Sequence, residues 1–377
     1  MDELESGRRE RLTAVAAELD QIFIERSEAV EGALAALLAG QHVLLIGPPG
    51  TAKSMLADEI CQRIEGANYF PWLLTKFTTP EEVFGAVSLR ALEQDEYRRV
   101  TTRKLPEADI AFLDEIFKAS SSILNALLTI LNERRFDNGR ERMQTPLRTL
   151  FGAANELPDE DELKAVYDRF LVRFVVEYIR EDWRFLRMLR ADGGTERTML
   201  TPEDLDRLGQ EAQRVEIPEA TLGHIVELRQ GLREKEVVAS DRRYQQSLAL
   251  LRALAFLRGK EAVGDDEVLF LEHVLWSDPA EQEVVRGVLR QVLHGHSEEI
   301  QELVIQAREL KEYAGRGWKS MEEQTRALIE VETKLRRILE RLEELAQEAR
   351  ESGRPTTHVD EAREEIQAMQ RGLQGRD

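Results

Sequence analysis

The sequence predicts an α/β fold in which a parallel sheet carries a nucleotide-binding loop and is followed by a helical domain and a helical C-terminal extension. Three short apolar runs, at 42–47, 110–115 and 148–155, alternate with helical patterns in the first half of the chain. Such runs are typical of buried strands in a parallel sheet that is covered by helices. After about residue 197, strand-like runs become scarce and helical patterns dominate. We therefore expect one α/β domain followed by helices.

The composition limits the location and the partners of the chain. Its 377 residues carry a formal net charge of −20 and a single cysteine, Cys61. An acidic chain repels the phosphates of nucleic acids, so nucleic-acid binding is not expected. No apolar run approaches the roughly 20 residues that a membrane-spanning helix needs, and the charged N-terminal sequence has no apolar segment typical of a secretion signal. The composition thus predicts a cytoplasmic protein in which Cys61 is buried and inert.

The elements between the strands are predicted from apolar spacing and turn residues. A Ser-rich start and apolar side chains at helical spacing predict a helix within 120–136. Asn138-Gly139 follows, which is a strong signal for a β-hairpin. A second hairpin is predicted around 87–102, where apolar runs flank polar turn residues.

Changes in composition predict three domains. We expect an α/β nucleotide-binding domain over residues 1–192, an α-helical lid domain over 196–276 and a helical extension over 277–377. Within the extension, residues 297–377 are expected to fold as an intramolecular helical hairpin rather than as a coiled coil between chains. Their apolar side chains alternate spacings of three and four, as in a heptad seam: Leu328, Val331, Leu335, Ile338, Leu342 and Leu345.

Residues 44–56, LLIGPPGTAKSML, indicate a strand that leads into a phosphate-binding loop and a helix. Backbone N–H groups of such a loop point at a phosphate, at the start of a helix whose dipole also favours an anion. Ala52 stands where the usual pattern has its second glycine, and we expect it to have helical dihedral angles with negative φ, where alanine is tolerated. The candidate nucleotide-binding residues of the loop are Gly47, Pro49, Gly50, Thr51, Ala52, Lys53, Ser54 and Met55.

Polar side chains at the ends of two further strands complete the predicted site. Lys53 is expected to contact the γ-phosphate of ATP, while Ser54 and Asp114 are expected to hold Mg²⁺. Glu115 is the candidate catalytic residue that polarises the attacking water, and Asn155 can hydrogen-bond that water or the γ-phosphate. Taken alone, such residues are more often solvated carboxylates or turn formers. Their order after the phosphate loop predicts an ATP site instead.

This order of elements resembles the P-loop AAA+ ATPases, and the two hairpins resemble the MoxR group of that superfamily. The MoxR group carries PGxAK, which accounts for Ala52. Longer stretches, such as ILNALLTILNERRFDNG and SDRRYQQSLALLRALAFLRGK, resemble the RavA-type ATPases, and this likeness runs from roughly residue 8 to 296. It implies a hexameric ring with ATP between subunits and a von Willebrand factor A-domain protein as partner. It also implies chaperone-like remodelling of a protein client that the sequence does not name.

The same resemblance assigns roles to two arginine pairs. Arg169 in YDRFLVRF corresponds to the catalytic arginine finger that a neighbouring subunit receives, with Arg173 as the alternative. Arg242 in SDRRY corresponds to the lid arginine, which is both catalytic and nucleotide-binding, with Arg243 as the alternative. A guanidinium suits both roles because it neutralises the charge that grows on the leaving phosphate. Each arginine could instead form a surface ion pair.

The chain departs from the RavA type at its C-terminal end. RavA-type proteins have a β-rich insertion that binds a lysine decarboxylase, whereas no strand-like stretch follows residue 300 here. That partner therefore stays open, and we expect residues 297–377 to dock the A-domain protein or the client. Two other functions remain as alternatives: a nucleic-acid-directed motor, which the net charge opposes, and the motor subunit of a metal chelatase, which would need a dedicated chelatase subunit.

Overall fold

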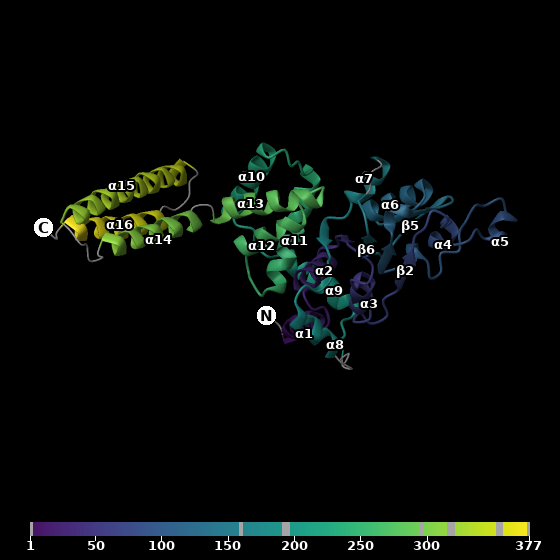
Figure 1. The fold of residues 1–377 in the computed structure, drawn as a ribbon. Coiled ribbons are helices and arrows are strands. Elements are labelled where there is room, and N and C mark those ends of the chain that lie inside the picture. The colour runs from purple at the N-terminus through teal and green to yellow at the C-terminus, as the bar shows by residue number, and fades with distance from the viewer. Residues whose placement is uncertain are drawn as a thin grey trace. The chain divides into compact units, whose positions relative to one another are not determined.

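The computed structural model describes residues 3–157, 161–190, 197–294, 297–314, 321–351 and 357–374. The contacts within the chain divide it into two compact units, Met1–Arg286 and Gly287–Asp377. The first unit contains the sheet and the helices that follow it, and the second is helical (Figure 1).

A five-stranded parallel sheet forms the centre of the first unit (Figure 1). Its strand order is β2-β3-β6-β1-β7, and each neighbouring pair is parallel. Parallel neighbours require crossover connections, which the helices supply, so the predicted α/β fold is confirmed. The strands are β1 (Val43–Ile46), β2 (Tyr69–Leu73), β3 (Ile110–Asp114), β6 (Thr149–Ala154) and β7 (Val172–Val175).

The three predicted strands are the inner ones, and the two that sequence analysis missed are the edges. Every residue of β1 and β6 is buried, as expected for the centre of a covered parallel sheet. In β2 only Phe70 is buried, and the strand contains Pro71, which an edge strand tolerates because proline has no N–H to donate. β7 contains the charged Arg173. Pro71 thus interrupts the apolar run of β2, and Arg173 interrupts that of β7, whereas the runs that identified the other strands are continuous.

Different helices pack against the two halves of this sheet. α3 contacts β2, β3 and β6, whereas α2 contacts β7. Cys61, at the end of α3, is buried, and burial raises the pKa of its thiol to about 12, so it is protonated at neutral pH. The elements of this part are α1 (Glu3–Ile22), α2 (Ser27–Ala39), α3 (Lys53–Cys61), α6 (Ser121–Glu133), α7 (Asp161–Tyr167), α8 (Asp182–Arg190), η1 (Leu105–Glu107) and η2 (Ile116–Lys118).

Two insertions pack on one another beyond the sheet. The predicted hairpin at Asn138-Gly139 is present as β4 (Arg135–Asn138) and β5 (Glu141–Gln144). The hairpin predicted around 87–102 is only partly present: Val87 and Arg99 form an antiparallel bridge, but the segment between them contains the short helix α5 (Leu89–Leu92), after α4 (Pro80–Phe84). The side chain of Asn138 joins the insertions by accepting from the N–H of Arg99 at 2.7 Å and donating to its carbonyl at 3.1 Å.

The helices after residue 197 complete the first unit. α9 and α11 both pack against α2, which connects them to the sheet domain. Among the described residues, no helix combines the length and apolar character needed to cross a bilayer. The elements are α9 (Pro202–Ala212), α10 (Glu219–Glu234), α11 (Asp241–Leu257), α12 (Asp265–Leu269), η3 (Phe270–His273), η4 (Pro279–Glu281) and the start of α13 (Gln282–His294), which continues into the second unit.

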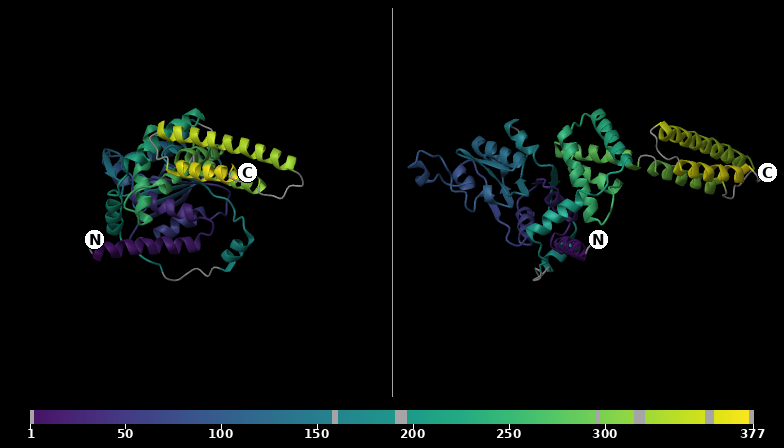
Figure 2. Two further views of the ribbon diagram at one scale, coloured as in Figure 1. Left: turned by 90° about the vertical axis from the view of Figure 1, so that its left-hand side faces the viewer. Right: turned by 180° about the vertical axis from the view of Figure 1, so that it is seen from behind.

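The second unit contains three mutually packed helices, α14 (Ser297–Ala314), α15 (Met321–Glu351) and α16 (Thr357–Gln374) (Figure 2). Its apolar seam faces inward within one chain, as predicted, although three helices share it rather than two. The core includes Val331, Leu335, Ile338, Leu342 and Leu345, with Leu328 packed against them.

Candidate nucleotide-binding site

The loop between β1 and α3 has the backbone geometry of an anion-binding turn. A Cβ added to Gly47 would lie 2.0 Å from the carbonyl oxygen of Val176, so only glycine fits there. Gly50 has a φ of +79°, which also favours glycine. The chain then enters α3, whose first N–H groups have no partners within the helix and whose dipole favours an anion.

Ala52 does not have the negative φ that we expected. It stands at the N-cap of α3 with φ 63° and ψ 25°, in the left-handed region. For an L-residue this conformation costs roughly 1–2 kcal/mol. The prediction was wrong because the turn that aims successive N–H groups at one point alternates right- and left-handed residues. The loop imposes this geometry on whichever residue stands before Lys53.

Lys53 points its amino group back across the loop. Nζ donates to the carbonyl oxygens of Gly47 at 2.6 Å and Pro48 at 2.8 Å. Burial lowers the pKa of Lys53, and the negative charges of Asp114 and Glu115 oppose that shift. The ammonium group is therefore held over the loop, where it can exchange two neutral carbonyl acceptors for a charged phosphate oxygen.

The predicted acidic and amide residues meet beside the loop, at the carboxyl ends of the strands; we call this end of the sheet the loop edge. Asn155 Nδ2 donates to Glu115 Oε1 at 2.6 Å, and Asn155 Oδ1 lies 3.5 Å from Lys53 Nζ. Asp114 Oδ1 accepts from the Glu115 N–H at 3.0 Å, and Glu115 itself has a left-handed φ of 52°. Lys118 Nζ lies 3.3 Å from Glu115 Oε2. Sequence analysis missed Lys118. Its spacing of three residues from Glu115 could have indicated the contact, because η2 places residues three apart on the same side of one helical turn.

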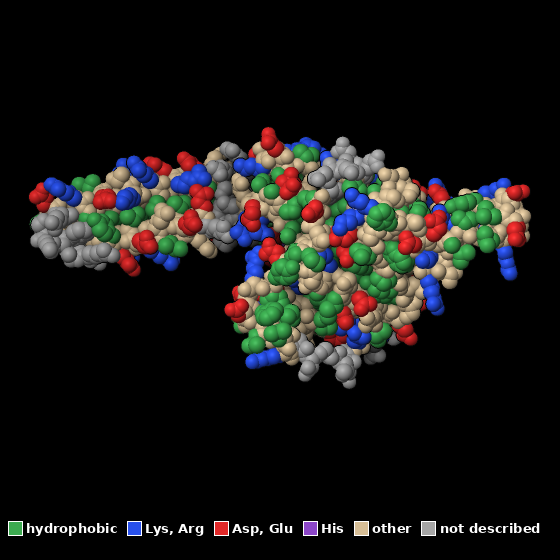
Figure 3. All heavy atoms as spheres, turned by 45° about the vertical axis from the view of Figure 1, so that its right-hand side comes forward, with side chains coloured by type: hydrophobic (Ala, Val, Ile, Leu, Met, Phe, Trp, Pro, Cys, Tyr) green, Lys and Arg blue, Asp and Glu red, His purple; other side chains and the backbone are tan. Residues whose placement is uncertain are grey.

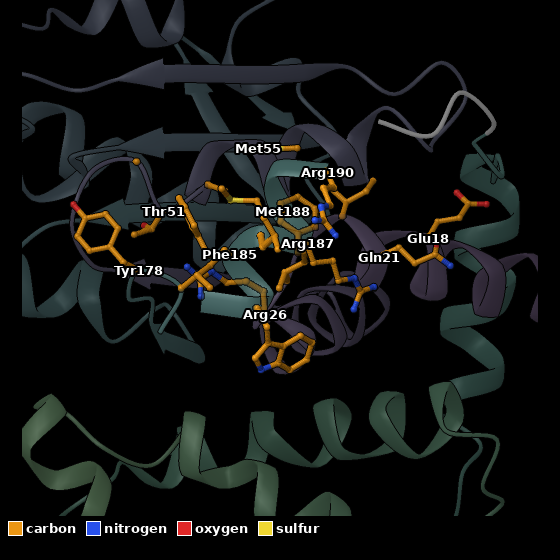
Figure 4. A pocket seen from close by; sticks show the side chains of 18 of the residues that line it. Glu18, Gln21, Arg26, Thr51, Met55, Tyr178, Phe185, Arg187, Met188 and Arg190 are labelled. Carbon is orange, nitrogen blue, oxygen red and sulfur yellow. The ribbon is translucent and has the colours of Figure 1, made fainter. Parts of the chain in front are cut away.

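A cavity of about 880 Å³ opens beside the loop (Figure 4). Thr51, Ala52 and Met55 line it, and Figure 4 places Thr51 and Tyr178 near one another at one end of it. Tyr178 Oη donates to the carbonyl of Pro49 at 3.1 Å, which connects the chain after β7 to the loop. No motif in the sequence pointed to the other lining residues, which include Ile24, Arg26, Ile179, Trp183, Phe185 and Met188.

The donor set fits a nucleoside triphosphate with Mg²⁺. The N-terminus of α3 and Lys53 offer N–H donors and positive charge to phosphate oxygens. The hydroxyl of Ser54 and the carboxylate of Asp114 are oxygen ligands of the kind that Mg²⁺ prefers. The largely apolar cavity next to Met55 can take a base.

Arg169 and Arg242 lie at the other end of the strands, where the strands begin; we call this end the arginine edge. Arg169 precedes β7, whose first residue pairs with Val43 at the start of β1, whereas the loop follows the end of β1. Arg242, on α11, donates from Nη2 to Asn132 Oδ1 at 2.8 Å. Burial, and then the nearby positive charge of Arg242, lower the pKa of Arg169. The structure thus brings the two predicted arginines together, but not to the loop of their own chain.

The alternatives Arg173 and Arg243 are buried inside the same chain. Each donates to backbone carbonyl oxygens, from Arg173 Nε to Phe170 and from Arg243 Nη1 to Leu171. Neither guanidinium can reach another molecule without opening the core. Within each pair, Arg169 and Arg242 are the more exposed side chains.

A family model described as the MoxR domain in the MoxR-vWA-beta-propeller ternary systems matches residues 10–210, more than half of the chain. The chain belongs to the MoxR family of AAA+ ATPases. A second family model, an AAA lid domain, matches residues 220–289 of this MoxR protein.

Relatives of this MoxR protein are found in archaea and bacteria. It is 35% identical over 371 residues to an uncharacterized protein of Methanocaldococcus jannaschii, with 97% of each chain covered. It is 27% identical over 271 residues to the chaperone MoxR1 of Mycobacterium tuberculosis, covering 67% of this chain and 71% of that one. The crystal structure of a proposed ATPase from Cytophaga hutchinsonii has a TM-score of 0.62 at 16% identity, covering 77% of this chain and 95% of that one. That last likeness concerns the fold alone.

Proposed function

We propose that this MoxR protein hydrolyses ATP with Mg²⁺ and uses the reaction to remodel or activate protein partners, in the manner of a RavA-type ring. One observation carries the proposal: the candidate site is divided between two edges of the sheet. Lys53 and Glu115 lie at one edge, while Arg169 and Arg242 lie at the other. A neighbouring subunit that presented its arginine edge to this loop would supply both cations to one ATP site.

The residues of the loop edge divide the chemistry among them. Bound Mg²⁺ would neutralise part of the phosphate charge, held by Ser54 and Asp114. Lys53 would move from the loop carbonyls to the γ-phosphate. Glu115 would orient and polarise the attacking water, with Asn155 fixing its carboxylate through the 2.6 Å hydrogen bond. Arg169 and Arg242 of the adjacent subunit would stabilise charge on the leaving phosphate.

The partners follow from the family and from exposed surfaces. The matching family is described by its ternary systems with vWA proteins, which supports a von Willebrand factor A-domain partner here. Exposed apolar side chains gather at the tip formed by residues 89–100 (Figure 3), namely Leu89, Leu92, Tyr97 and Val100. We propose that this tip contacts the client. We also propose that the second unit docks a partner, since it folds around a core of its own outside the residues that the two family models match.

Subunit mixing tests the divided site. Arg169→Ala and Lys53→Ala subunits should each be inactive alone, because an arginine finger contributes on the order of 10³-fold or more to the rate. Mixed together, some interfaces would join an intact loop to an intact Arg169, so hydrolysis should partly return. Arg242→Ala should behave like Arg169→Ala in the same mixture. A mixture that co-assembles without regaining activity would contradict the division of the site between subunits.

A further inference from the structure

Two buried arginines lie beside the loop that carries Arg169. This loop, residues 168–171, joins α7 to β7, and its neighbours are Arg173 on β7 and Arg243 on α11, only 1% and 3% exposed. Burial, with Arg243 nearby, lowers the pKa of Arg173 to about 9, so Arg173 remains a cation at neutral pH. Burial also lowers the pKa of Arg243, and the charge of Asp168 opposes that shift. A buried guanidinium needs acceptors for its five N–H groups. The acceptors therefore identify what each arginine holds in place.

Arg243 binds the loop and the lid at once. Its Nη1 donates to the carbonyls of Leu171 and Val274, both at 2.9 Å. Its Nη2 donates to the Asp168 carbonyl at 3.1 Å, the Asp168 carboxylate at 3.1 Å and the Phe170 carbonyl at 3.2 Å. One planar guanidinium thus bridges the chain on both sides of Arg169 to Val274, which lies much later in the sequence.

Arg173 and Tyr167 make the same connection a second time. Arg173 donates from Nε to the Phe170 carbonyl at 3.2 Å, from Nη2 to the Tyr167 carbonyl at 3.3 Å, and from Nη1 to the Trp276 carbonyl. Its guanidinium also lies 3.9 Å from the centre of the Tyr167 ring. Tyr167 Oη donates to the Ser277 carbonyl at 2.8 Å. The chain at 274–277 is therefore fastened to the loop at several points.

We propose that Arg243 and Arg173, the arginine clamp, are positioning residues that make the Arg169 loop move with the lid. The clamp joins two regions that the family models separate, since the loop lies within residues 10–210 and the 274–277 segment within the lid match of 220–289. A displacement of the lid in one subunit would carry Arg169 toward or away from the ATP site of the next. This inference rests on the proposed role of Arg169 in a neighbouring site.

The contacts of Arg169 distinguish a positioning role of the clamp from a role in stabilising the fold alone. Its backbone is held on both sides, yet its Nε is buried without a hydrogen-bond partner and its Nη1 is 3.3 Å from Asp168 Oδ2. A buried donor without an acceptor is costly and needs an explanation. If the clamp served stability alone, apolar side chains could join these elements without the cost of desolvating two cations. The backbone around Arg169 is thus fixed, whereas its guanidinium is about a fifth exposed and is held by the ion pair with Asp168. This is the arrangement expected of a group that can exchange that partner for an acceptor on another molecule.

Hydrogen–deuterium exchange tests the clamp without any assay of activity. Arg243→Lys keeps the charge and the alkyl stem, but one ammonium cannot reach the acceptors of both Nη1 and Nη2. Amides within 163–176 should exchange about tenfold faster or more, because hydrogen bonds to a charged group are lost, while those of α3 should not change. Tyr167→Phe, which removes only the Ser277 bond, should give a smaller increase. The control is Arg258→Lys, at the other end of α11, whose partners Glu31 and Glu267 lie outside the loop.

Mixed subunits then test the effect on Arg169. Arg243→Lys should lower kcat about tenfold or more. The KM for ATP should change little, because the phosphate-binding loop of the variant is intact. Mixed with Lys53→Ala it should recover activity, whereas mixed with Arg169→Ala it should not, since neither variant offers a well-placed Arg169. Unchanged exchange, or recovery with Arg169→Ala, would overturn the inference. Failure of the Arg169→Ala and Lys53→Ala mixture would instead overturn the shared site, while the exchange rates still decide whether the clamp exists.

Discussion

Replacing Ala52 with glycine should stabilise this protein, although glycine in a helix or its first turn usually weakens it. Residue 52 has φ 63° and ψ 25°, a conformation that costs an L-residue roughly 1–2 kcal/mol and glycine almost nothing. Glycine gives back about 0.4–1 kcal/mol, because the unfolded chain gains conformational freedom. The methyl group of Ala52 is exposed, so little packing is lost. The net expectation is a free energy of unfolding higher by about 0.5–1 kcal/mol.

The assay is urea denaturation followed by tryptophan fluorescence. In a Trp318→Phe background the remaining tryptophans, Trp72, Trp183 and Trp276, all belong to the first unit, so the signal reports the domain that contains the loop. The matched control is Ala17→Gly, an exposed position inside α1, where the same substitution should cost about 0.5–1 kcal/mol. The two variants should therefore shift the midpoint in opposite directions.

Equal destabilisation by Ala52→Gly and Ala17→Gly would refute the reasoning, because it would mean that residue 52 is right-handed in solution. The affinity for ATP should stay within a few-fold of the parent. Glycine adopts the same left-handed turn and leaves the backbone N–H groups in place.

Other predictions concern the chemistry, the pH dependence and the second unit. Lys53→Ala should weaken ATP binding, whereas Glu115→Gln should bind ATP and fail to release phosphate; turnover at the parental rate would show that Glu115 is not the base. Burial, with Arg134 nearby, holds the pKa of His42 well below its ordinary value. Below about pH 6.5 the unfolded chain therefore binds more protons than the folded one, so the free energy of unfolding should decrease as the pH is lowered, by up to about 1.4 kcal/mol per pH unit. A His42→Gln variant with the same pH dependence in urea titrations would contradict this. Deleting residues 297–377 should spare basal hydrolysis and abolish capture of the A-domain protein or client; a deletion that binds partners but cannot hydrolyse ATP would make the segment an assembly element.

The sequence predicted those features that depend on local residue order. Continuous apolar runs identified β1, β3 and β6, because inner strands of a covered sheet are buried on both faces. The motif residues could be assigned to one site because they follow the phosphate loop in the order expected of an ATP site. In the fold, Glu115 and Asn155 do lie in hydrogen-bond contact.

Features that depend on tertiary contacts could not be predicted in the same way. Arg242 and Arg243 are neighbours on one helix, so they point about 100° apart, and only the packed fold decides which is buried. The cavity residue Tyr178 follows an edge strand with no apolar run to identify it. For Ala52, the intrinsic preference of alanine suggested a helical φ, but the geometry of the turn overrode it.

The division of the site restricts how subunits can assemble. The loop edge and the arginine edge lie at opposite ends of the same parallel strands. A two-fold axis across the strands would join both pairs of edges within one closed dimer. A head-to-tail contact joins one arginine edge to one loop edge, and its repetition around an axis closes a ring. The proposed hexamer and the proposed trans role of Arg169 therefore have the same geometric origin. In such a ring, an Arg169→Ala subunit would leave its own ATP pocket intact and inactivate the pocket of its neighbour.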